Sequence, residues 1–338
     1  MKQIEFVVNE KDKYADLAPV LERAATVTAL KIKSSTETHL PDGLSKLPQL
    51  KALYVTNASF TTLPAELGAL KSLEALVVQC PQLTAIPPEL GECTGLRQLS
   101  ISSGQTITSV PAALGRCANL EHLDLSLLPA LKGLPDELAS LSRLKNLNLY
   151  GSGVTRLPRL AGWAQLEVLN LSRPATGSRP IPEDVGDLAA LLRLEADSCQ
   201  LETLPASLSR LKKLESLVLS QNKLIALPDD LGELASLKQL NLRSNALTAL
   251  PASIGKLSKL ERLELEGNPL SSLPKELPSL AALKFFGLDA ARLKTIPEEL
   301  KAFANPKLRV TIEKATPAAV KKKLIALLGK DRVVVQKF

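Results

Sequence analysis

Leucines and polar residues alternate along this chain in an order that returns every 23 or 24 residues. The clearest copy, residues 214–236, reads L-x-x-L-x-L-x-x-N-x-L-x-x-L-P-x-x-L-G-x-L-x-x. Leu217 and Leu219 are two positions apart, so on a strand they share one face, and Val218 faces the opposite way. The pattern therefore predicts that each copy begins with a short strand that has an apolar inner face.

The rest of each copy has the residues that a tight return segment needs. The amide of Asn222 both donates and accepts, so it can satisfy backbone groups at the bend after the strand. Pro228 suits the first turn of a short helix or 3₁₀ segment, and Gly232 permits a neighbouring backbone to approach closely. One copy cannot enclose all its leucines, so stacked neighbours must close the core, as in a leucine-rich repeat.

The proline of the motif marks about twelve repeats, and it stands at positions 41, 64, 87, 111, 135, 158, 182, 205, 228, 251, 274 and 297. The predicted fold class is an α/β solenoid, a leucine-rich repeat horseshoe. A parallel sheet would line its concave side, and short helices or 3₁₀ segments its convex side. Trp163 stands where a leucine belongs, and we expect it in the core on the convex side. Asparagine occupies the bend only at Asn222, Asn245 and Asn268.

The repeats are expected to span residues 27–312, between two caps. Residues 1–26 form the predicted N-terminal cap, with a strand over 4–8 and a helix over 11–25. A further strand is expected over 307–312. Residues 313–338 form the predicted C-terminal helical cap, in which Thr316 is the expected N-cap, Pro317 the first helical residue and Gly329 the residue that ends the helix.

The L-P-x-x-L-G-x-L unit resembles the intracellular class of leucine-rich repeats. It is similar to the plant Ras-group proteins, to the Ras-pathway scaffold of animals and to type III effectors of plant-associated bacteria. The resemblance implies a concave docking surface for a protein partner and, for the effectors, delivery into a host cell. An alternative that it leaves open is the substrate-recognition part of a ubiquitin-ligase effector whose catalytic domain is absent here.

Composition and charge agree with a leucine core and argue against a nucleic-acid partner and a membrane span. Of the 338 residues, 45% are hydrophobic and only 3% aromatic, as a uniform leucine core requires. The net charge of +7 is spread along the chain and no nucleic-acid motif accompanies it, so no nucleic-acid partner is expected. The N-terminus lacks the features of a signal peptide and no apolar run is long enough for a membrane span. We therefore expect a monomeric, cytoplasmic, non-enzymatic protein-binding scaffold.

The side chains that face outward from the strands form three columns. Their N-terminal members are small and neutral, whereas amides, acids, arginines and a tyrosine follow from His122 onward. Tyr150, Arg193 and Arg243 are the expected anchors, and truncating Tyr150 or Arg243 should change stability by less than about 0.5 kcal/mol. The predicted partner-binding residues are His122, Asp124, Asn148, Tyr150, Asn170, Arg193, Glu195, Asp197, Arg243, Arg262 and Glu264.

Catalytic and metal chemistry find little support in the sequence. His122, Asp124 and Ser126 alternate on one strand, but a nucleophile–base triad needs histidine between the other two. The cysteines Cys80, Cys93, Cys117 and Cys199 are scattered singly, without the paired spacing of a disulfide framework or a zinc site. No cofactor, metal or catalytic residue is therefore predicted.

Overall fold

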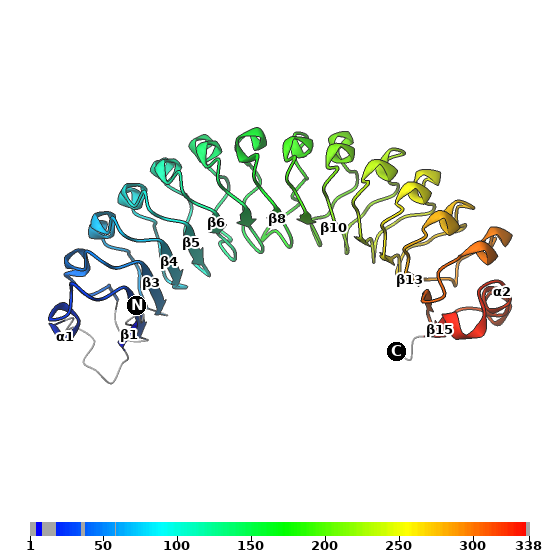
Figure 1. The fold of residues 1–338 in the computed structure, drawn as a ribbon, viewed down its shortest axis with the longest axis horizontal. Coiled ribbons are helices and arrows are strands. Elements are labelled where there is room, and N and C mark those ends of the chain that lie inside the picture. The colour runs from blue at the N-terminus through cyan, green and yellow to red at the C-terminus, as the bar shows by residue number, and fades with distance from the viewer. Residues whose placement is uncertain (1–4, 9–17, 35–37, 58, 336–338) are drawn as a thin grey trace. The chain divides into compact units, whose positions relative to one another are not determined.

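Parallel strands and 3₁₀ turns alternate along the whole described chain, as a computed structural model shows (Figure 1). The structure describes residues 5–8, 18–34, 38–57 and 59–335. The chain divides into a first unit, Met1–Thr176, and a second unit, Gly177–Phe338, which are described separately below.

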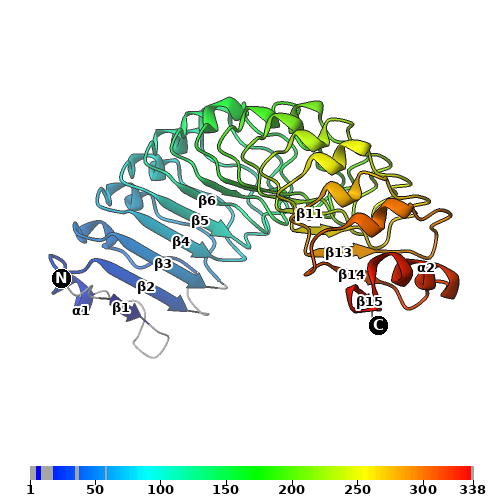
Figure 2. The same ribbon diagram turned by 45° about the vertical axis from the view of Figure 1, so that its right-hand side comes forward.

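The strands of each unit follow one another in sequence order (Figure 2). The first unit contains β1 (Glu5–Val8), β2 (Ala29–Ser34), β3 (Ala52–Asn57), β4 (Ala75–Gln79), β5 (Gln98–Ser102), β6 (His122–Asp124), β7 (Asn146–Asn148) and β8 (Val168–Asn170). The second contains β9 (Arg193–Glu195), β10 (Ser216–Val218), β11 (Gln239–Asn241), β12 (Arg262–Glu264), β13 (Phe285–Leu288), β14 (Arg309–Ile312) and β15 (Val333–Val335). The solenoid class predicted from the sequence is confirmed.

Strand register is set by the repeat. Ser216 of β10 pairs with Gln239 of β11, and Gln239 pairs with Arg262 of β12. Each step is 23 residues, so equivalent positions of neighbouring repeats stand side by side. Two of the three predicted outward columns run through the paired strands. They are confirmed within each unit, because equivalent outward positions of neighbouring strands, such as Asn146 and Val168, are register partners.

The return segments are 3₁₀ turns that lie on the side away from the sheet in each unit. In the first unit they are η2 (Leu44–Lys46), η3 (Ala65–Ala69), η4 (Pro88–Glu92), η5 (Ala112–Arg116), η6 (Asp136–Ser140) and η7 (Leu160–Trp163). In the second they are η8 (Val185–Asp187), η9 (Ala206–Arg210), η10 (Leu231–Glu233), η11 (Ala252–Lys256), η12 (Leu277–Ser279), η13 (Glu298–Ala302) and η14 (Lys330–Arg332). The helices are α1 (Ala18–Leu21) and α2 (Ala318–Leu328).

The core is a stack of leucines that the repeat directs inward. All seven leucines of residues 214–236 are buried, as the pattern predicts. Trp163 is fully buried in η7, and its indole Nε1–H donates to the carbonyl of Leu138 at 2.8 Å. The prediction that this tryptophan replaces a core leucine is therefore confirmed, and its polar atom is satisfied by the preceding repeat.

The asparagine side chains join neighbouring bends in the second unit. Oδ1 of Asn222 accepts hydrogen bonds from the backbone N–H groups of Cys199 and Leu201, at 2.9 and 3.0 Å. Its Nδ2 donates to the carbonyls of Ala196 and Leu219, at 2.8 and 2.9 Å. The predicted role at the bend is confirmed, and the structure extends it to the backbone of the preceding repeat.

The cap predictions are wrong in two details. The helix expected over 11–25 is present only as α1, and Arg23, Ala24 and Thr26 donate instead in turns; residues 11–17 of that prediction lie outside the described residues. Pro317, not Thr316, occupies the N-cap position of α2. The Thr316 hydroxyl is buried and has no hydrogen-bond partner within the described part of the chain. A strand that the sequence analysis missed, β15, pairs with β14 beyond α2.

Candidate functional site

The side chains on the outward face of β6 and β7 in the first unit form hydrogen bonds with neighbouring residues. Nδ2 of Asn146 lies 2.8 Å from Nδ1 of His122. Asp124 accepts from the backbone N–H of Ser126 at 2.9 Å and from the Ser100 hydroxyl at 3.4 Å. His122 is thus paired with an amide and Asp124 with serine groups, which gives no histidine-to-serine relay at this strand.

Tyr150 lies one repeat further along this face. It is half-buried, and the guanidinium carbon of Arg173 lies 5.9 Å from the centre of its ring. Asn148 accepts from the backbone N–H of Tyr150 at 3.1 Å, and Asn170 accepts from that of Ser172 at 2.9 Å. The two asparagines therefore fix the chain where each strand ends, and the exposed arginine lies over the half-buried tyrosine ring.

In the second unit the predicted charged residues pair with one another. Nη1 of Arg193 lies 3.4 Å from Oε1 of Glu195, and the arginine side chain is about half exposed. Asp197 follows two positions later and accepts from the Ser198 hydroxyl at 3.4 Å. These partly exposed pairs contribute little to stability and leave polar groups within reach of a partner.

Around β12 the charges are packed more closely. Arg262 pairs with Glu264 through its Nε, and its guanidinium carbon lies 4.0 Å from the centre of the Phe285 ring. Nη1 of Arg243 lies 3.7 Å from Oε2 of the same Glu264, whose side chain is only 12% exposed. A hollow of about 350 Å³ lies beside this cluster, over Leu217, Val218, Gln239, Leu240 and Asn241.

Three acidic residues stand in successive positions of the third outward column, and we call Glu266, Asp289 and Glu313 the acidic row. They lie two residues beyond Glu264, Gly287 and Thr311, which are register partners. Partial burial raises the pKa of the Glu313 carboxyl, and the charge of Asp289, a hydrogen bond with Asp289 and the charge of Glu266 raise it further. The three carboxyl groups of the row thus lie close enough to interact with one another.

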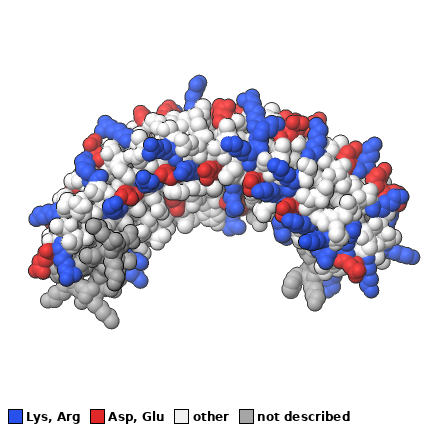
Figure 3. All heavy atoms as spheres, in the orientation of Figure 1, with Lys and Arg blue, Asp and Glu red and all other residues white. Residues whose placement is uncertain are grey.

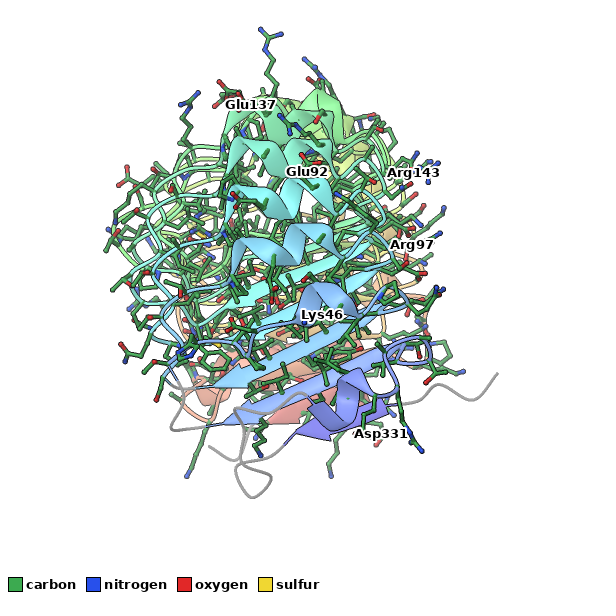
Figure 4. All side chains as sticks on the ribbon, turned by 90° about the vertical axis from the view of Figure 1, so that its left-hand side faces the viewer. Lys46, Glu92, Arg97, Glu137, Arg143 and Asp331 are labelled. Atoms are coloured by element: carbon green, nitrogen blue, oxygen red, sulfur yellow. The ribbon has the colours of Figure 1, made fainter. Side chains whose placement is uncertain are left out.

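The flanks and turns carry charges of both signs that pair from repeat to repeat. Figure 3 shows lysines and arginines interspersed with acids on the face in view. In the first unit, Glu121 pairs with Arg97 at 3.2 Å and with Lys145 at 2.8 Å, and Glu92 pairs with Arg116 at 2.9 Å. Figure 4 shows Arg97 on the flank and Glu92 at the turns. These pairs belong to the scaffold.

The structure places the predicted partner-binding residues in two groups on the outward face of the strands, which we call the open face of each unit. The open face of the first unit carries His122, Asp124, Asn148, Tyr150 and Asn170, and the open face of the second unit carries the others. The sequence analysis missed the acidic row, although two of its members stand in the predicted third column. The sequence signal for the acidic row is the continuation of the third column to Glu313, just after the strand expected over 307–312.

Comparisons with known proteins agree with this geometry. Residues 11–156 match a family model described as a leucine-rich repeat region. A leucine-rich repeat protein of Leptospira interrogans is 24% identical, with a TM-score of 0.78 over 99% of this chain and 90% of its own. The chain has the leucine-rich repeat fold. No curated protein sequence matches it.

Two further structures show how widely this leucine-rich repeat fold is used. An internalin of Listeria monocytogenes is 18% identical, with a TM-score of 0.72 over 94% of this chain and 88% of its own. A chain from the Toll–Spätzle complex of Drosophila is 21% identical, with a TM-score of 0.73; the match covers 91% of this chain and 42% of that chain. At these identities the likeness shows the fold alone.

Within the described residues, no helix is long and apolar enough to cross a membrane. The same part of the chain contains no group of three or more His, Cys, Asp or Glu residues arranged to hold a metal ion. The four cysteines are all buried in the core. Burial raises the pKa of the Cys93 and Cys117 thiols to about 11.

Proposed function

We propose that this leucine-rich repeat protein is a non-enzymatic binding module that holds a protein partner on the open face of its sheet. The observation that carries the proposal is the pair formed by Tyr150 and Arg173, a half-buried ring beneath an exposed guanidinium. Tyrosine and arginine are the residue types that most often anchor protein interfaces. Tyr150 and Arg173 lie just beyond the ends of β7 and β8, where Asn148 and Asn170 hydrogen-bond the backbone.

The solved structures support the same reading. One similar chain comes from a complex between Toll and Spätzle, so this repeat architecture is compatible with binding a protein ligand. The wider proposal is a monomeric scaffold that works in the cytoplasm. Its more specific form, a bacterial effector delivered into a host cell, is supported by the sequence resemblance and by the likeness to two bacterial proteins.

Affinity capture with matched variants tests the proposal. The immobilised protein is compared with a face variant, Tyr150→Ala with Arg193→Ala, and with a flank variant, Arg97→Ala with Arg143→Ala, and bound proteins are quantified by mass spectrometry. A partner that uses the open face should be retained by the flank variant and lose about tenfold in affinity with the face variant, as is typical when interface anchors are truncated. Equal retention by both variants would place the binding surface elsewhere.

A further inference from the structure

Glu266 is a buried carboxylate without a hydrogen bond. The residue is 5% exposed, and neither of its side-chain oxygens has a hydrogen-bond partner among the described residues. Its carboxylate lies against Gly287, and a Cβ at position 287 would overlap the carboxylate. A buried carboxylate without hydrogen bonds is costly, and a cationic neighbour that donates hydrogen bonds would lower that cost.

Arg243 satisfies Glu266 only in part. Its Nε lies 3.8 Å from Oε2 of Glu266 and its Nη1 lies 3.7 Å from Oε2 of Glu264, and both distances exceed those of a hydrogen bond. Glu264 already pairs with Arg262. The Arg243 side chain is 48% exposed, so it is not packed against the buried carboxylate of Glu266.

The ion pairs of the described residues reach only two of the four neighbouring carboxyl groups. Arg262 and Arg243 pair with Glu264, and Arg243 also lies 3.8 Å from Glu266, whereas no such pair includes Asp289 or Glu313. The guanidinium of Arg309, on β14, donates to the carbonyl of Leu308 at 3.2 Å. In a chain with a net charge of +7, three acidic residues thus follow one another in a single outward column of the second unit.

We propose that the acidic row binds an arginine side chain of a protein partner. In the free protein, Arg243 pairs with Glu266 in place of that arginine. The incoming guanidinium displaces that of Arg243 into solvent and donates directly to Glu266, with Asp289 and Glu313 beside it. An arginine suits this place better than a lysine because its five donors form a planar fork that matches carboxylates, and because it is less strongly hydrated. The inference rests on the proposed function, since it names the group that the open face recognises.

Three capped pentapeptides test the inference: acetyl-Gly-Ser-X-Ser-Gly-amide, where X is arginine, lysine or citrulline. Each is titrated into the full chain, and the backbone amides of Gly287 and Leu288 are followed by NMR. The arginine peptide should shift these amides with a Kd in the millimolar range, and citrulline, which keeps the shape and loses the charge, should not. Arg243→Ala should tighten binding about threefold and Glu266→Gln should weaken it about fivefold, as expected for gaining and losing one charge-assisted contact.

Glu261→Gln is the matched control, because Glu261 pairs with Lys284 at 2.7 Å and lies outside the acidic row. It should leave the Kd of the arginine peptide unchanged. Equal binding of the citrulline or lysine peptide would overturn the assignment to arginine. Saturable shifts of the same amides by calcium chloride alone would replace the side-chain site with an ion site, and an Arg243→Ala variant with unchanged affinity would remove the displacement step.

The effect of two double variants on the binding of a protein partner distinguishes a failure of this inference from a failure of the proposed function. If Glu266→Gln with Glu313→Gln leaves partner binding intact while Tyr150→Ala with Arg193→Ala abolishes it, the arginine site is wrong and the protein-binding function stands. If the peptide titrates as expected but no protein is retained on the open face, the proposed function fails and the chemistry of the site stands.

Discussion

Nδ2 of Asn222 donates to the carbonyl of Ala196, 26 residues earlier, at 2.8 Å. Asn245 and Asn268 repeat the relationship with Leu219 and Leu242, at 2.9 and 2.8 Å. Each asparagine thus satisfies buried backbone groups of two successive repeats at once. The three side chains form a row that holds the bends of the second unit together.

Asn222→Ala should lower the free energy of unfolding by about 2–3 kcal/mol, because it leaves several buried backbone donors and acceptors without partners. Urea titration measures the loss. Gln239→Ala, an exposed change on the same unit, is the control and should stay within about 0.5 kcal/mol. A loss that does not exceed the control would mean that water replaces the asparagine without penalty.

Gly232→Ala should destabilise the second unit, because the added Cβ would overlap the carbonyl oxygen of Ser253 in the next 3₁₀ turn. Forcing the two turns apart should lower the free energy of unfolding by about 1–3 kcal/mol. Thermal melting compares this variant with Ser236→Ala, in the same repeat. Similar melting temperatures would show that the turns separate freely.

Arg243→Ala should lower stability by about 1–2 kcal/mol, since it leaves the buried Glu266 carboxylate without a cation. This replaces the value of less than about 0.5 kcal/mol that the sequence suggests for an exposed arginine. Measured in a Glu266→Gln background, the same change should be nearly neutral. A double-mutant cycle by urea titration gives the coupling, and additive effects would mean that the two groups do not interact.

Glu313→Gln should stabilise the protein at pH 7, by less than about 1 kcal/mol because the carboxyl is only partly buried. The pKa of Glu313 is raised above its ordinary value of 4.5, so the folded wild type binds a proton more readily than the unfolded chain does. Wild-type stability from this group is therefore present below pH 4.5 and is lost as the pH rises through the folded pKa. Melting curves at pH 4 and pH 7 test this, with Glu299→Gln as control; an equal gain at both values would contradict it.

Cys93 and Cys117 should resist alkylation in the folded protein. Both thiols are buried, their pKa is raised to about 11 by that burial, and Sγ of Cys93 donates to the carbonyl of Leu67 at 3.2 Å. Because the thiolate is the reactive form, iodoacetamide at pH 8 should modify them only after urea is added. Mass spectrometry of the two samples decides, and rapid labelling without urea would show that these repeats open readily.

The sequence predicts the strands and their register well, because two short-range signals agree. Leu217 and Leu219 fix which face is inside, and a step of 23 residues fixes which positions become neighbours, such as Val218 and Asn241. It predicts the caps less well. The strand β15 has no repeat pattern, and the burial of Thr316 depends on how α2 packs against the last repeats.

The site is only partly readable from the sequence. The columns place Arg243 and Glu266 on one face. They do not show that the Glu266 carboxylate lies against Gly287 or that its oxygens lack hydrogen bonds within the described residues. Residue type alone likewise does not show that the side-chain oxygens of Asn148 and Asn170 accept hydrogen bonds from the backbone two residues further on. These features arise from packing between repeats.

The asparagine row also bears on the order in which the second unit forms. A solenoid contacts mainly its nearest neighbours, so folding begins where adjacent repeats reinforce one another most and then spreads to both sides. Asn222, Asn245 and Asn268 make such links in three consecutive repeats. We expect this stretch to act as the nucleus of the unit: its amides should exchange with deuterium last, and a partner held at its C-terminal end would meet a surface that is already rigid.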